Sequence, residues 1–301
     1  MRSTLSAVLK GLALAGLLVL SFVFFFPEYR YSLWGVKLLY QAPVEEKRNL
    51  VVDVQIMEGR EVRGPGAPQD AVGLADSAKL DASLEETTLG PGSEFLLDYK
   101  LTQVRSEQFA WNQPKPGKLS GFHWQGRVSN RGNLGGVKLE ERSNALWARE
   151  NVAWTWMGSL WPPLPGGRVR PGEIWTGELR AFCVFPEKPD GFALVMRPTF
   201  TLDRVFREDG KTFAEYHWEG QVAGDGSVGL TITGDCKGKA VNSVEDQRCL
   251  AAEFSVEMKG EAPVVVRGSE GDAMKIAWHQ KVTGRVYRTL PAPAAPAAPK
   301  N

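Results

Sequence analysis

The three histidines are the side chains of this chain best suited to bind a transition metal, and each one is next to a tryptophan. The pairs are His123-Trp124, His217-Trp218 and Trp278-His279. Imidazoles that converge from three strands could hold zinc or copper. However, no ligand spacing and no supporting polar pattern accompany them, so they stay weak metal candidates and we expect no cofactor.

Other catalytic signatures are missing from the sequence. It has no GxSxG or HExxH motif, and Cys183 has no histidine nearby in sequence. The carboxylate pairs Glu85-Glu86 and Glu140-Glu141 lie in segments that look exposed, so we interpret them as solvated charges. An enzyme is therefore not expected, although acids and bases can converge from distant strands without a motif.

The two histidine–tryptophan pairs at 123–124 and 217–218 belong to an internal repeat. Residues 122–128 (FHWQGRV) reappear as residues 216–222 (YHWEGQV), and a glycine-containing turn follows each copy. Such a turn suits a β-hairpin. On a strand, alternation places Trp124 and Trp218 on the apolar face and His123 and His217 on the other face. The tryptophans either fill a core or line a groove for a hydrophobic ligand, so Trp124 and Trp218 are candidate ligand-binding residues.

Cys236 and Cys249 flank a polar segment of twelve residues. We expect these two cysteines to form a disulfide that closes a long hairpin loop, as an oxidising compartment would allow. Closing such a loop stabilises the fold by about 3 kcal/mol in the chain-entropy model. Cys183 lies in an apolar segment and is expected to be a packed strand thiol.

The N-terminus predicts a membrane attachment. Residues 5–26 form an apolar run of 22 residues, which is adequate for a helix that spans a bilayer. The run ends in FFFP without a small-residue cleavage site, and Tyr29, Tyr31 and Trp34 follow as interfacial aromatics. We expect an uncleaved anchor in the inner membrane, with the N-terminus inside and the rest extracytoplasmic (periplasmic). The alternative is secretion after signal cleavage. With 36 basic and 35 acidic residues, the chain has no charge excess that would favour nucleic acid.

Alternation of apolar and polar residues predicts strands at residues 50–57 and 95–104. The expected fold is mainly β, with duplicated antiparallel halves arranged as a sandwich or half-barrel and joined by one crossover helix. The expected organisation is an anchor at 1–27, a juxtamembrane segment at 28–48, a first β repeat at 49–143 with a long loop at 58–91, a helix and Pro-rich linker at 144–171, a second β repeat at 172–290, and a disordered Pro/Ala tail at 291–301.

The linker resembles a known pattern. Residues 164–175 (LPGGRVRPGEIW) are similar to the mid-chain LPxxxVxPGxxW signature of uncharacterised exported bacterial β-proteins. The resemblance implies duplicated β halves that meet at this linker and a location in the cell envelope, and it implies no catalytic residues. This chain differs from that pattern by its expected membrane helix.

These observations predict a non-catalytic binding or scaffolding protein held at the membrane, with an envelope protein or a hydrophobic ligand as its possible partner. A carrier or chaperone for a lipid or lipoprotein is the first alternative. An enzyme without a recognisable motif is the second.

Overall fold

The computed structural model describes residues 27–41, 47–63, 72–90, 92–106, 121, 123–139, 161–185, 188–224, 231–264 and 274–288. These ranges contain one helix, α2 (Pro27–Trp34), and fifteen strands. The strands are β1 (Val36–Lys37), β2 (Lys47–Arg63), β3 (Val72–Gly90), β4 (Glu94–Ser106), β5 (His123–Ser129), β6 (Leu134–Leu139), β7 (Arg168–Val169), β8 (Ile174–Thr176), β9 (Leu179–Phe185), β10 (Lys188–Met196), β11 (Thr199–Glu208), β12 (Lys211–Gly224), β13 (Thr231–Ser243), β14 (Arg248–Val264) and β15 (Met274–Arg288).

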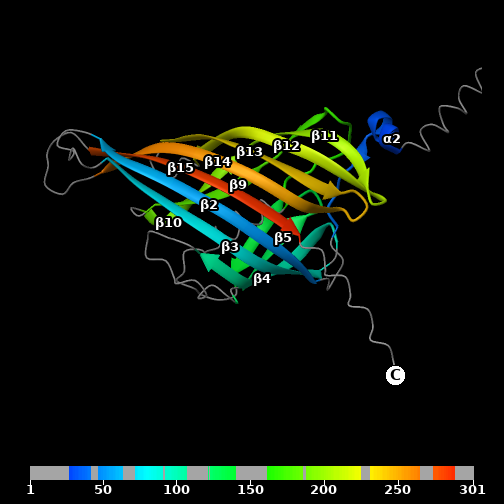
Figure 1. The fold of residues 1–301 in the computed structure, drawn as a ribbon, viewed down its shortest axis with the longest axis horizontal. Helices are drawn as coiled ribbons and strands as arrows, with labels where there is room; N and C mark the ends of the chain where they lie inside the picture. The colour runs from blue at the N-terminus through cyan, green and yellow to red at the C-terminus, as the bar shows by residue number, and fades with distance from the viewer. Residues whose placement is uncertain are drawn as a thin grey trace, which may run out of the picture.

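Thirteen of these strands form one antiparallel sheet, and β1 pairs with β7 in a separate ladder. The order across the sheet is β6-β5-β4-β3-β2-β15-β14-β13-β12-β10-β9, with β11 and β8 branching from β12. β15 lies between β14 and β2, so strands from the two ends of the described chain meet in mid-sheet (Figure 1). The mainly β, antiparallel prediction is confirmed. The two expected halves lie side by side in one curved sheet, not in the two separate sheets of a sandwich.

Alternation of apolar and polar residues explains the long strands that the sequence predicted. In β2, Val52 and Val54 are buried while Asp53 and Gln55 are exposed. In β4, Phe95, Leu97 and Tyr99 are buried in the same way. These side chains form part of the core on the inner face of the sheet.

The predicted loop at 58–91 is wrong. Most of it is strand, because β2 continues to Arg63 and β3 runs for 19 residues from Val72 to Gly90. Ala82, Leu84, Glu86 and Thr88 face inward from β3. Small and acidic residues at these positions conceal the period of two, which is why the sequence predicts a loop here. Pairing with β2 and β4 along both sides overrides this weak local preference.

The repeat forms equivalent parts of the sheet. β5 and β6 make a hairpin through residues 130–133, and β12 pairs with β13. Tyr99 of β4 lies opposite Trp124, and Phe200 of β11 lies opposite Trp218. Each copy therefore presents its tryptophan to an aromatic ring of the preceding strand.

A short segment of the predicted linker lies inside the fold. We call residues 161–165 (WPPLP) the buried strap, because all five are buried. Its three prolines carry no N–H and need no acceptor there, and the Leu164 N–H donates to the Arg131 carbonyl (2.9 Å). Tyr40 donates its hydroxyl hydrogen to the Pro162 carbonyl (2.8 Å), and the Trp175 indole donates to the Pro163 carbonyl (2.9 Å). The strap thereby connects the segment before β2 with the β8 branch.

Three expectations concern residues outside the described ranges. These are the membrane span at residues 5–26, the crossover helix at residues 144–160 and the tail at residues 291–301. Within the described ranges, no helix has both the length and the apolar character that a membrane crossing requires.

Candidate functional site

The three histidines lie apart, and each one contacts a carboxylate on a neighbouring strand. The ring nitrogens lie 2.5 Å from Asp98 for His123, 2.6 Å from Asp203 for His217 and 3.0 Å from Glu257 for His279. His217 and His279 are exposed, and His123 is half-buried. The described part of the chain contains no group of three or more His, Cys, Asp or Glu side chains that could hold a metal ion.

Trp124 and Trp218 are buried in the core, with exposures of 1% and 2%. The Trp124 ring stacks on Tyr99 with centroids 5.6 Å apart, and Trp218 contacts Phe200 at the same centroid distance. The Trp218 ring also lies directly over Gly238 of β13, where an added Cβ atom would overlap it. Trp218 therefore packs against the chain's own residues.

The predicted disulfide between Cys236 and Cys249 is wrong, because both thiols are free and buried. The segment after Cys236 continues as strand to Ser243 instead of forming a loop. Cys249 lies opposite Asn242, six positions from Cys236 along β13, which corresponds to roughly 20 Å. A disulfide requires Cα atoms about 4.4–6.8 Å apart. The side chain of Cys183 lies outside the described part of the structure.

The described core contains a charge cluster that the sequence analysis missed. The buried charge cluster consists of Arg48, Glu86, Tyr99 and Arg288. The Glu86 carboxylate accepts hydrogen bonds from Arg288 Nη1 (2.7 Å), Tyr99 Oη (2.7 Å) and Arg48 Nη1 (3.5 Å). Exposure of the three charged side chains is 1% for Glu86, 6% for Arg48 and 7% for Arg288. The expectation that Glu86 is a solvated charge is therefore wrong.

The cluster continues into the buried strap. The Trp161 indole donates a hydrogen bond to Tyr99 Oη (2.8 Å), and the Arg288 guanidinium lies 5.5 Å from the Trp161 ring centroid. Arg288 Nε also donates to the Cys249 carbonyl (2.6 Å). The cluster thus connects β2, β3, β4, β14 and β15 with the strap.

Phase along the strands is the signal that could have revealed this cluster. Arg48 lies on the same face of β2 as the buried Leu50 and Val52, because positions two apart on a strand share a face. Arg288 likewise shares a face of β15 with Val286. Glu86 shares a face of β3 with Leu84. Opposite charges at in-phase positions on different strands can satisfy one another in the core.

The surroundings of Glu86, Tyr99 and Cys249 each favour one protonation state. Burial raises the pKa of Glu86, but the charge and hydrogen bond of Arg288, the Tyr99 hydroxyl and the Arg48 charge outweigh burial and lower it. Burial raises the pKa of Tyr99 well above 10.0, with the Glu86 charge adding to the effect. Burial likewise raises the pKa of Cys249 to about 12. Near neutral pH the Glu86 carboxyl is therefore ionised and the Tyr99 hydroxyl is neutral, and the Cys249 thiol is a poor nucleophile.

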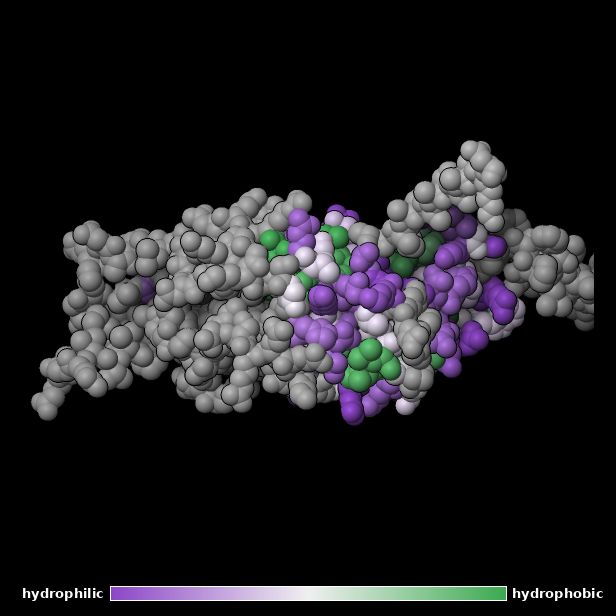
Figure 2. All heavy atoms as spheres, turned by 90° about the horizontal axis from the view of Figure 1, so that it is seen from below, coloured by the Kyte–Doolittle hydropathy of each residue, from purple (hydrophilic) through white to green (hydrophobic). Residues whose placement is uncertain are grey.

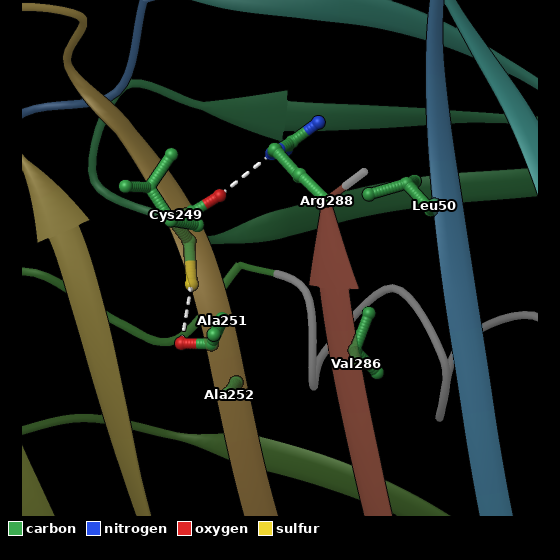
Figure 3. Close-up of a pocket in the computed structure, with 7 residues that line it drawn as sticks. Leu50, Cys249, Ala251, Ala252, Val286 and Arg288 are labelled. Carbon is green, nitrogen blue, oxygen red and sulfur yellow. Dashed lines mark hydrogen bonds between the residues drawn. The ribbon is translucent and has the colours of Figure 1, made fainter. Parts of the chain in front are cut away.

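A small hollow lies beside the cluster (Figure 3). It is lined mainly by apolar side chains, among them Leu50, Ala252 and Val286, with Cys249 and Arg288 at one side. Its empty volume is about 150 Å³. This space includes open solvent and leaves no room for a water-sized molecule, so the hollow cannot hold a lipid.

The surface offers a different kind of site. In Figure 2, much of the described surface on the visible face is hydrophilic, with a few separate apolar patches. Leu33 and Trp34 of α2 are large apolar side chains with exposures of 52% and 51%. They are adjacent in sequence and follow the predicted membrane span by a few residues.

No protein-family model and no curated protein matches the chain. Among solved structures, Pseudomonas aeruginosa OpdQ matches at 8% identity, with 81% of this chain and 98% of that chain covered and a TM-score of 0.22. Pseudomonas aeruginosa OpdK with vanillate matches at 9%, with 82% and 100% covered and a TM-score of 0.23. A BenF-like porin from Pseudomonas fluorescens Pf-5 matches at 8%, with 81% and 99% covered and a TM-score of 0.21. Similarities this weak carry no argument about function.

Proposed function

We propose that this chain is a membrane-anchored, extracytoplasmic β-rich protein with a non-catalytic binding or scaffolding role in the cell envelope. The close packing of the interior that the structure describes is the observation that carries the proposal. The repeat tryptophans, the buried strap and the buried charge cluster all pack against the chain's own residues. A partner would then bind the outer surface or an edge of the sheet.

The location is part of this proposal. The apolar run at residues 5–26 supports a single span of the inner membrane with the N-terminus inside. The juxtamembrane segment contains most of α2 and all of β1, which supports a short connection between the bilayer and the sheet.

A topology and extraction experiment tests the anchor. A periplasm-dependent reporter fused after residue 301 is expected to be active, and the full chain is expected to stay with membranes through an alkaline wash. An inactive reporter or release by the wash would contradict the anchored arrangement.

Lipid analysis tests the non-catalytic scaffold against the carrier alternative. Organic extraction of the full chain, purified in detergent, is expected to release no lipid species at a fixed stoichiometry. One lipid species recovered at one molecule per chain in repeated preparations would favour the carrier and overturn the scaffolding role.

A further inference from the structure

The face formed by α2, β1 and β7 combines exposed apolar and basic side chains. We call these residues, Arg30, Leu33, Trp34, Lys37 and Arg168, the basal face; all five are exposed. We propose that the basal face docks on the membrane surface, with Leu33 and Trp34 in the interfacial region and the basic side chains on anionic phospholipid headgroups. This inference rests on the proposed membrane anchor.

The packing of α2 fixes which side chains point outward. Tyr31 packs against the core, whereas Arg30, Leu33 and Trp34 are exposed. With 3.6 residues per turn, Leu33 lies nearly opposite Tyr31, and Arg30 and Trp34 continue the exposed arc towards the Tyr31 side. An exposed leucine, tryptophan and arginine that follow a membrane span are residue types found in the membrane interface.

The end of α2 holds this arc rigidly against the sheet domain. Gly35 has a φ of +70°, and its N–H donates to the Tyr31 carbonyl (2.9 Å), which is a left-handed helix cap. Arg168 Nη1 donates to the Gly35 carbonyl (3.0 Å), and Val36 pairs with Val169. A span that ends at residue 26 would therefore bring this end of the sheet domain to the bilayer. Figure 1 shows α2 on the outside of one end of the sheet.

The charges of β1 and β7 point to an anionic surface. Lys37 and Arg168 lie directly opposite each other in the ladder, and like charges at such positions repel. Neither side chain forms an ion pair with a residue that the structure describes. The nearby acid Glu173 accepts a hydrogen bond from the Arg170 backbone N–H (2.9 Å). Headgroup phosphates would relieve the repulsion between Lys37 and Arg168.

Fluorescent labelling of the full chain in vesicles tests the docking. Leu33→Cys, made in a Cys183→Ser background, is labelled with a polarity-sensitive fluorophore and reconstituted into phosphatidylcholine with or without phosphatidylglycerol. Burial raises the pKa values of Cys236 and Cys249 to about 11 and about 12, so these thiols add little label. The matched control is Met57→Cys, an exposed apolar position on β2.

The label at residue 33 is expected to shift to shorter wavelength and to be quenched by brominated lipid, whereas the label at residue 57 is not. Lys37→Glu or high salt is expected to lower the docked-to-undocked ratio in anionic vesicles about five-fold.

Two outcomes separate this inference from the anchor. If the chain stays with vesicles through an alkaline wash while residue 33 remains as water-exposed as residue 57, the docking is wrong and the anchor stands. If the wash releases the chain, both are wrong.

Two further outcomes concern the lipid itself. Equal shifts in the two lipid mixtures would overturn the headgroup contact. Shielding of residue 33 only in native membranes would indicate a protein partner and overturn lipid docking.

Discussion

At the scale of single residues, Glu86 has the largest expected effect on stability. Glu86→Gln removes the anion that two buried arginines share, and we expect a loss of about 3–5 kcal/mol in the free energy of unfolding. Denaturant unfolding of the full chain measures this loss. Glu85→Gln is the matched control: Lys47 and Glu85 form an exposed pair, so the cost should stay below about 1 kcal/mol. Equal effects at both positions would contradict a buried charge cluster.

The same residue predicts an acid limit to stability. The pKa of Glu86 in the folded chain lies below its ordinary value of 4.5, so folding favours the ionised form. The stability that Glu86 contributes is present above pH 4.5 and is lost as pH falls through its folded-state pKa. Denaturant midpoints measured from pH 7 to pH 3 should fall less steeply in Glu86→Gln than in the unsubstituted chain. Parallel curves would show that Glu86 does not titrate as proposed.

The free cysteines predict a test by alkylation. Burial raises the pKa of Cys236 to about 11 and that of Cys249 to about 12, so both thiols should resist alkylation at pH 8 in the native protein. After denaturation without a reductant, mass spectrometry should find both residues alkylated. If both cysteines stay unalkylated after denaturation and react only when a reductant is added, the two residues form a disulfide after all.

At the scale of secondary-structure elements, close contacts between aromatic rings and glycines hold neighbouring strands. The Trp218 ring covers Gly238, and the Phe254 ring covers Gly284. A methyl group at either glycine would overlap the ring, so Gly238→Ala and Gly284→Ala should each cost about 1–3 kcal/mol. Gly59→Ala in β2 is the control, because no atom lies within 4 Å of its added Cβ. Thermal unfolding of the three variants measures the difference.

The elements also show what could be predicted from the sequence. Regular alternation predicted β2 and β4, and the repeat predicted the hairpin of β5 and β6. β3 was missed because its inward positions include alanine, glutamate and threonine, which have no strong strand preference alone.

The buried charge cluster could not be predicted for a related reason. Glu86 and Arg288 are 202 residues apart in sequence, and only the completed sheet brings them together. The burial of the strap was not predicted either, since its sequence indicates only a Pro-rich linker and the donors for its carbonyls come from residues as distant as Tyr40.

At the scale of the whole molecule, the continuous sheet predicts a single unfolding transition. β2 and β15 join the two halves, and the strap contacts side chains from both. Calorimetric and spectroscopic unfolding curves of the full chain should therefore coincide. Two resolved transitions would show that the halves fold independently.

The position of β15 has a consequence for folding during synthesis and export. β2 emerges early, but one of its two neighbours in the sheet is β15, the last strand that the structure describes. Until residues 274–288 have emerged, β2 and β14 each present an open edge that can pair with another chain. Pairing across such a long sequence separation is slow. An export pathway for this protein would therefore have to keep two strand edges apart from other chains until residues 274–288 have been synthesised and exported.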